Sequence, residues 1–167
     1  MNKLKLFTDG SVNTKSKIGY GAYLFISEYD VSVHSLQKHV QVKQFEETSS
    51  TKLELQTLLW ALDEIVTGEN KVTIYTDSQN IVSLLERRER LEENKYSSKK
   101  NKLIKNHQLY KEFYKISDKI NLEIIKVQGH KKSSQKGEID QYFTLVDRAS
   151  RNALRKDNSK DRKFICQ

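Results

Sequence analysis

Short apolar runs along the chain predict five β-strands. Their residues alternate apolar with polar side chains, or are rich in branched and aromatic ones, as is typical of strands. The runs cover 3–8, 22–27, 31–42, 71–76 and 121–127. A polar, glycine-bearing segment at 15–21 predicts a loop, and residues 28–30 have the length of a hairpin connection.

The strongest helical pattern covers 49–67, where leucines recur at helical spacing. Serine and threonine ahead of it are suitable N-caps, and Gly68 stands where such a helix ends. A second helix is predicted directly after Asp77, and a final amphipathic helix over 141–154.

The elements follow one another in the order β-β-β-α-β-α-α-β-α. Three consecutive strands predict an antiparallel meander, and the later strand–helix–strand units predict parallel strands with helices packed on the sheet. Ligands of such sheets gather beyond the carboxyl ends of the strands. The pattern therefore predicts an α/β protein with a site at that edge.

Acidic residues recur beside the apolar segments. Asp9 and Asp77 each end an apolar run, so both are expected at strand carboxyl ends, whereas Glu54 and Asp147 lie inside predicted helices. A carboxylate in such surroundings costs desolvation energy unless a cation compensates it. Converging carboxylates suit hard divalent cations such as Mg²⁺, so one shared site is expected.

The charge balance narrows the choice of partner. The 167 residues include 30 Lys and Arg against 22 Asp and Glu, a net charge of +8. This excess favours a polyanionic partner, either nucleic acid or an acidic membrane surface. A soluble basic protein without such a partner is the plain alternative.

Length and cysteine content set the remaining limits. One domain is expected over 1–157, with a short basic tail at 158–167. Cys166 is the single cysteine, so a reducing cytoplasm is compatible with the chain, and we expect a cytoplasmic monomer. No apolar stretch approaches the roughly 18 residues that span a bilayer, so no membrane partner is expected.

A basic segment lies between residues 94 and 115. It carries seven lysines, one acid (Glu112) and interleaved aromatic side chains. A solvated helix face normally mixes the two signs of charge, so we interpret this segment as a phosphate-binding surface that includes Lys99, Lys100 and Lys102. An ordinary exposed surface is the alternative.

Several short motifs stand in order along the chain, each beside a predicted element. They are Asp9-Gly10-Ser11, Gly19-Tyr20-Gly21, Glu54, Thr76-Asp77-Ser78-Gln79, Gln128-Gly129-His130, Asp147, Ala149 and Asn152-Ala153. Each motif alone is weak. Together they make nearly the whole chain resemble type 1 ribonuclease H.

The resemblance implies a ribonuclease H-like α/β fold. Such a fold has a mixed five-stranded sheet, with three antiparallel strands followed by parallel ones, and helices on both faces. It also implies an endonuclease that hydrolyses the RNA strand of RNA–DNA hybrids and leaves a 3′-hydroxyl and a 5′-phosphate. Two Mg²⁺ ions, with Mn²⁺ as a substitute, are the implied cofactors.

The metal ligands implied by the resemblance are Asp9, Glu54, Asp77 and Asp147. Asp9 is the implied bridging ligand, Asp147 completes the nucleophile side, and Glu54 and Asp77 serve the leaving-group side. Paired metals of this kind, roughly 4 Å apart, activate water and stabilise the leaving oxygen.

His130 is implied to lie near the nucleophilic water or the departing product. A histidine with a pKa of about 6.5 can carry protons at neutral pH. Glu138, in what the sequence predicts to be a long basic loop before Asp147, is a further acid that could reach the metals, with a solvated loop acid as the alternative.

Selectivity for a hybrid requires recognition of the RNA 2′-hydroxyl. The resemblance implies that backbone around Gly10 and Ser11 faces the RNA strand together with Glu54, and that Gln79 reaches the minor groove. Ser50 and Thr51 stand where relatives often have asparagines, so they are weaker candidates for contacts in that groove.

Two departures from the family pattern concern substrate contacts. Segment 12–17 lacks the Asn-Pro-Gly type of turn found in many relatives, and the basic segment lacks the tryptophan of the family's protruding handle. Trp60 is interpreted as a core residue. The alternatives are a nucleic-acid-binding module that has lost turnover, or a related nuclease for another duplex.

Overall fold

A mixed five-stranded sheet forms the centre of the computed structural model, which describes residues 2–27, 33–65, 70–129, 131–135 and 137–165. Its strands are β1 (Asn2–Asn13), β2 (Ile18–Ser27), β3 (Gln41–Phe45), β4 (Asn70–Thr76) and β5 (Asn121–Lys126), in the spatial order β3-β2-β1-β4-β5. The first three strands pair antiparallel, and β1–β4 and β4–β5 pair parallel. The expected mixed sheet is confirmed.

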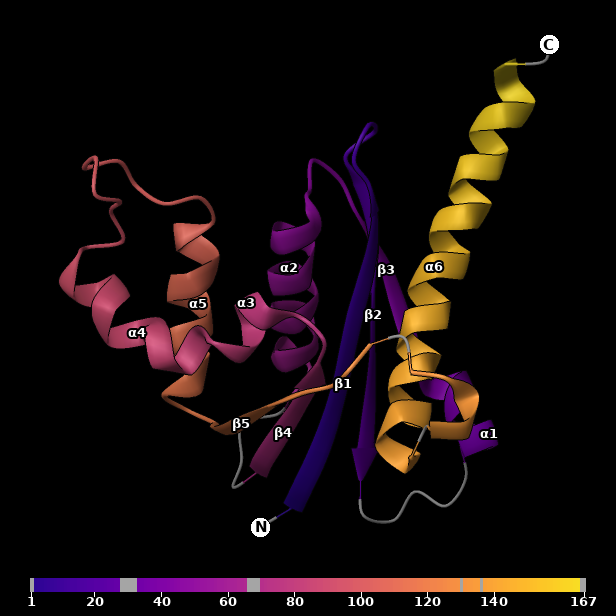
Figure 1. Cartoon of the computed structure of the whole chain (residues 1–167), viewed down its shortest axis with the longest axis horizontal. Helices are drawn as coiled ribbons and strands as arrows, with labels where there is room; N and C mark the ends of the chain where they lie inside the picture. The colour runs from indigo at the N-terminus through magenta and orange to yellow at the C-terminus, as the bar shows by residue number, and fades with distance from the viewer. Residues whose placement is uncertain (1, 28–32, 66–69, 130, 136, 166–167) are drawn as a thin grey trace.

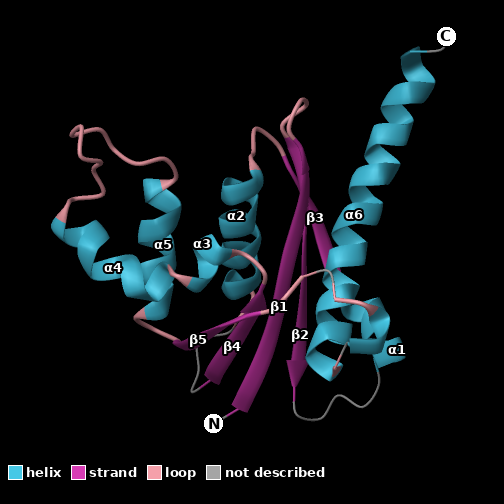
Figure 2. Cartoon of the chain, viewed as in Figure 1, coloured by secondary structure: helices cyan, strands magenta, loops and turns pink. Residues whose placement is uncertain are grey.

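Helices cover both faces of this sheet (Figure 1, Figure 2). One face carries α2 (Ser50–Asp63) and α5 (His107–Ser117), and the other carries α6 (Glu138–Ile165) and the short α1 (Val33–Leu36). Successive side chains of a strand point to opposite faces. Leu6 accordingly lies in the α2–α5 core and Phe7 in the α6 core.

Helix α2 packs unusually close to β1 and β2. Its N-cap is Ser49, whose hydroxyl accepts a hydrogen bond from the Lys52 amide, so the helix begins one residue later than the sequence predicts. A Cβ added to Gly21 would lie 2.0 Å from the Thr57 hydroxyl, and one added to Gly10 would lie 2.8 Å from Leu53. Glycine at these positions therefore sets how near α2, and Glu54 on it, comes to the sheet.

The predicted strand over 31–42 is wrong for most of its length. Residues 33–36 form α1, Gln37–His39 form a 3₁₀ turn, and β3 begins at Gln41. Leu36 and Val40, four residues apart, pack into the α6 core, and this spacing fits a helix as well as a strand, so the apolar pattern alone does not separate the two. Residues 28–32, with the predicted hairpin connection, lie outside the described residues.

Two further element boundaries differ from the sequence prediction. The helix expected after Asp77 divides at Ser83 into α3 (Gln79–Val82) and α4 (Leu84–Glu93). Segment 15–21 is a loop only as far as Lys17, because β2 begins at Ile18. The predicted helix end at Gly68 lies outside the described residues.

The last helix is much longer than the pattern indicates. It begins at Glu138, where the sequence predicts a loop, and runs to Ile165, so residues 158–165 continue α6 instead of starting a separate tail. Neither Gly nor Pro interrupts residues 138–165. No helix among the described residues is long and apolar enough to cross a membrane.

Residues 94–106 of the basic segment form a small hairpin, the basic hairpin, between α4 and α5, and the rest of the segment belongs to α5. Ser97 and Leu103 bridge across it, and its lysines at 95, 99, 100, 102 and 105 are exposed. The aromatic residues Tyr110, Phe113 and Tyr114 are instead buried in the α2–α5 core. These five lysines therefore face solvent, whereas Lys111 on α5 lies over the Tyr96 ring.

Candidate functional site

Asp9 lies within β1 and not at its end, so that part of the prediction is wrong. It pairs with Ala22, and the antiparallel pairing with β2 continues to Asn13. The parallel pairing with β4, however, ends at Phe7 and Tyr75. Asp9 therefore stands just past the last β4 pair, where the two strands part and side chains from neighbouring elements can approach.

Asp77 follows directly after the last residue of β4, as predicted. Together with Asp9 and with Glu54 from α2, it lines a small cavity of about 10 Å³. Ser78 caps α3, and its hydroxyl also donates a 2.5 Å hydrogen bond to Glu54 Oε2. One serine thus ties the start of α3 to the acid on α2.

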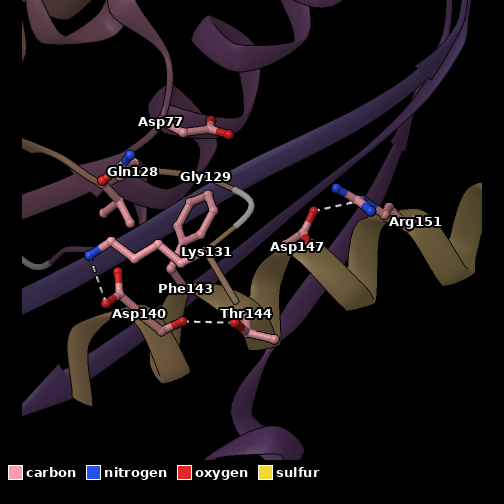
Figure 3. Close-up of a pocket in the computed structure, with 10 residues that line it drawn as sticks. Asp77, Gln128, Gly129, Lys131, Asp140, Phe143, Thr144, Asp147 and Arg151 are labelled. Carbon is pink, nitrogen blue, oxygen red and sulfur yellow. Dashed lines mark hydrogen bonds and ion pairs between the residues drawn. The ribbon is translucent and has the colours of Figure 1, made fainter. Parts of the chain in front are cut away.

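Asp147 approaches from the opposite face of the sheet, on α6. It lines a pocket of about 340 Å³ with Asp77 and with residues of the segment after β5 (Figure 3). Arg151, one helical turn along, donates from Nε to Asp147 Oδ1 at 2.8 Å. The guanidinium therefore holds the Asp147 carboxylate at the edge of this pocket.

The carboxylates influence one another's ionisation. Burial, followed by the nearby carboxylates of Asp77 and Asp147, raises the pKa of Asp9 to about 8, against the opposing hydrogen bond from the Gly10 amide. Burial also raises the pKa of Glu54; the bond from Ser78 lowers it, and Asp77 adds to the rise. The structure therefore brings the four predicted acids into one electrostatically coupled group.

The donor set suits a hard divalent cation. Within the described part of the chain, no three acidic, histidine or cysteine side chains are gathered tightly enough to hold a metal ion as they stand. Two of the acids interact with nearby side chains instead: Glu54 accepts a hydrogen bond from Ser78, and Asp147 forms an ion pair with Arg151. All four are oxygen donors, and a cation among them would offset the repulsion that raises the Asp9 pKa.

The segment after β5 lies against these acids. A Cβ added to Gly129 would lie 3.3 Å from Asp77 Oδ2, so a larger residue would crowd that carboxylate. Lys131 pairs with Asp140 at 3.1 Å, and the Gly137 amide donates to the same carboxylate. His130 lies outside the described residues, whereas Glu138 is the first residue of α6 and accepts a hydrogen bond from Tyr142.

The predicted substrate residues are spread around the acids. Ser50 and Thr51 are exposed in the first turn of α2, and Lys99, Lys100 and Lys102 are exposed on the basic hairpin. The positions at the acids themselves are more constrained. Gly10 faces Leu53 of α2, and the Ser11 hydroxyl lies 3.2 Å from that of Ser150 on α6.

Gln79 is exposed at the start of α3. Lys126, the last residue of β5, donates from Nζ to Gln79 Oε1 at 2.8 Å. The oxygen of the Gln79 amide accepts this hydrogen bond, so the NH₂ group of the same amide faces away from Lys126.

Sequence reasoning assigned no role to two residues that hold the acids in place, or to one ion pair beside them. Arg151 stands four residues after Asp147 in a predicted helix, a spacing that by itself indicates an ion pair. Ser78 follows Asp77 directly, in the position of an N-cap. The Lys131–Asp140 pair gave no such signal, because the sequence predicts a loop there.

The chain is similar to known proteins over most of its length. Residues 1–154 match the family model described as RNase H. The chain is 24% identical over 163 residues to a ribonuclease H of Acetivibrio thermocellus, an alignment that covers 96% of this chain and 100% of that protein. It is 26% identical over 84 residues to a ribonuclease H of Ruthia magnifica, covering 50% and 52% of the two chains.

Among solved structures, a foamy viral protease-reverse transcriptase in complex with dsDNA has a similar fold. The TM-score is 0.62 at 13% sequence identity, and the match covers 89% of this chain and 93% of that chain. At this identity the likeness concerns the fold alone.

Proposed function

Because the chain belongs to the ribonuclease H family, a family of nucleases that cut RNA–DNA hybrids, we propose that it hydrolyses the RNA strand of such hybrids by two-metal-ion catalysis. The proposed products carry a 3′-hydroxyl and a 5′-phosphate. Mg²⁺ is the proposed cofactor, with Mn²⁺ as a substitute, and a monomer in the cytoplasm is the proposed working form.

The burial of Asp9 between two other carboxylates is the observation that carries this proposal. A half-buried acid whose pKa is raised to about 8 by desolvation and neighbouring acids is costly to ionise alone. Such an arrangement is typical of a site that works with bound cations and has perturbed pKa values. We assign the four acids as ligands: Asp9, Glu54, Asp77 and Asp147.

Each acid has a separate task in this proposal. Bound divalent ions supply an activated water and stabilise the charge on the leaving oxygen. Asp9 would bridge the two ions and Asp147 would hold the nucleophile side. Glu54, whose carboxylate accepts a hydrogen bond from Ser78, and Asp77 would hold the leaving-group side. His130 would move a proton at the nucleophilic water or the departing product.

Hybrid selectivity would come from contacts with the RNA strand. Backbone at Gly10 and Ser11, with Glu54, would meet the 2′-hydroxyl. Lys126 holds the Gln79 oxygen, so the free NH₂ would donate to minor-groove acceptors, and Ser50 and Thr51 would line the same groove. Lys99, Lys100 and Lys102 would contact phosphates.

Matched substrates test the proposal directly. RNA–DNA, RNA–RNA, DNA–DNA and single-stranded forms of one sequence are incubated with the protein and Mg²⁺, and the product ends are identified. We expect preferential cutting of the RNA strand of the hybrid. Equal or better cutting of another duplex would replace the proposal with a different nuclease, and tight hybrid binding without cutting would indicate a binding module.

The variant Asp77→Asn tests the site assignment. Removal of one ligand charge should abolish cleavage, while hybrid binding measured by fluorescence anisotropy remains. Asp63→Asn is a suitable control, because Asp63 is exposed at the end of α2 and should have no effect. Turnover retained in Asp77→Asn would remove Asp77 from the metal site.

A further inference from the structure

The C-terminal half of α6 extends beyond both the apolar core and the family match. The helix has 28 residues, and the match to the family model ends at residue 154. Its buried anchors to the α6 core end at Val146, followed by partly buried Ala149 and by buried Ser150. The helix nevertheless continues past the β1–β2 turn, on the opposite side of the sheet from α4 and the basic hairpin (Figure 1).

A polar contact places the β1–β2 turn beside this extension. Asn13 Nδ2 donates to Asn158 Oδ1 at 3.2 Å. The oxygen of the same Asn13 amide accepts from the Lys15 and Ser16 amides and so shapes the turn. The C-terminal half of α6 is therefore fixed relative to β1, the strand that carries Asp9.

Exposed basic residues of α6 fall on two different sides of the helix. At about 100° per residue, Arg148 and Arg155 lie roughly 80–100° from Asp147, on its solvent side. Lys156 and Lys160 lie roughly 180–220° from Asp147, on the side turned away from it. All four are exposed, and none makes an ion pair with another residue that the structure describes.

We propose that Arg148 and Arg155 form a phosphate-binding edge that holds one strand of the duplex as it leaves the acidic site along α6. This edge rests on the proposed function and adds to it a second backbone contact, separate from the basic hairpin. The two arginines are about 10 Å apart along the helix axis, or roughly three phosphates of one strand. Arg151, between them, connects the edge to Asp147.

A simpler explanation is that cations near a helix C-terminus stabilise the helix dipole. This explanation makes Lys156 and Lys160 at least as important as the arginines, because they lie nearer to that end. If the arginines form a phosphate-binding edge beside the acids, hybrid binding should depend on the arginines and not on the lysines. The two pairs therefore form a matched test on one helix, with equal charge removed.

The experiment compares R148A/R155A with K156A/K160A and the wild type. Hybrid binding is measured by anisotropy against salt concentration, without divalent metal, and cleavage is measured with Mg²⁺. Three hybrids are used: a long one, and two that end two base pairs from the cut on one side or the other. R148Q/R155Q repeats the test with uncharged side chains that are closer in length to arginine than alanine is. Circular dichroism checks that each variant is folded.

We expect R148A/R155A to raise KM on the long hybrid roughly fivefold and to reduce the salt slope by roughly 0.9 for each phosphate that is no longer neutralised. The defect should vanish on one of the two shortened hybrids, and K156A/K160A should match the wild type throughout. Equal defects in both pairs, a defect on all three hybrids, or no defect at all would overturn the proposed edge. Failure of the wild type to cut any hybrid would instead count against the proposed function.

Discussion

At the scale of single residues, Asp9 has its chemistry set by its neighbours. Its position in β1 places it where burial and two further carboxylates disfavour its charge. Glu54 and Asp147 are held by Ser78 and Arg151 respectively. The same four acids that would bind cations are therefore a source of instability when no cation is present.

This arrangement predicts a pH-dependent stability of the metal-free protein. The pKa of Asp9 is raised from 3.8 to about 8 in the fold, so between these values the folded state binds one proton more than the unfolded state. Stability should therefore fall as the pH rises from about 4 to about 8. Thermal unfolding in EDTA should show this fall, and Asp9→Asn should remove much of it.

Added Mg²⁺ provides the complementary result. It should raise the unfolding temperature of the wild type at pH 8 and leave that of Asp9→Asn nearly unchanged, because ligands that bind only the folded state stabilise it. A pH profile of stability that is identical in the wild type and the variant would show that Asp9 ionises normally.

At the scale of secondary-structure elements, the approach of α2 to the sheet positions Glu54. The missing side chain at Gly21 leaves room for Thr57, three residues after Glu54 on the same helix. Any residue with a Cβ at this position must push α2 outward or distort Thr57. The distance between Glu54 and the acids on the strands therefore depends on one glycine in β2.

Gly21→Ala should destabilise the protein by roughly 1–3 kcal/mol, as overpacking does. It should also lower cleavage by more than the loss of folded protein explains, because Glu54 moves with α2. Denaturant unfolding and kcat at a temperature where both proteins are folded provide the measurements.

Two companion variants make this prediction specific. Thr57→Ala combined with Gly21→Ala should restore part of the stability, since the closest contact is with the Thr57 side chain. Gly137→Ala should be tolerated, because its added Cβ would meet only Asp140 at 3.9 Å. A Gly21→Ala protein of normal stability and activity would show that α2 and Thr57 can accommodate a Cβ at residue 21 without moving Glu54.

At the scale of the whole molecule, basic surfaces flank the acidic group on both sides of the sheet. The hairpin between α4 and α5 is on one side and the C-terminal half of α6 on the other (Figure 1). Part of the net charge of +8 therefore lies on the basic hairpin and on the C-terminal half of α6. A duplex over the acids would meet positive charge in both directions.

Replacing Lys99, Lys100 and Lys102 together with alanine should weaken hybrid binding and flatten its salt dependence. The slope of log K against log salt should fall by roughly 0.9 for each phosphate that these lysines neutralise in the wild type. Replacement of the exposed Lys3, Lys38 and Lys119 removes the same charge elsewhere and should have a much smaller effect. An unchanged slope in the first variant would show that the hairpin does not touch the backbone.

Local sequence patterns were sufficient to predict the elements whose structure depends mainly on their own residues. The leucine spacing of α2, its Ser49 cap and the apolar runs of β4 and β5 could all be predicted, because burial of one face and local hydrogen bonds dominate there. The motifs around the four acids likewise identified them as a set. The strand predicted over 33–39 was wrong because the spacing of Leu36 and Val40, which pack into the α6 core, fits a strand and a helix equally.

The sequence by itself therefore determined the presence of five strands and of the main helices between them, the positive charge and the identity of the acids, since these depend on composition and short-range pattern. Only the tertiary structure decided that Asp9 lies inside a strand, that Ser78 links the start of α3 to Glu54 on α2, and that Asn13 of the β1–β2 turn contacts Asn158 on α6. These relations join residues from separate elements, or depend on a helix whose length the pattern does not indicate. Such long-range packing leaves no local signal in the chain.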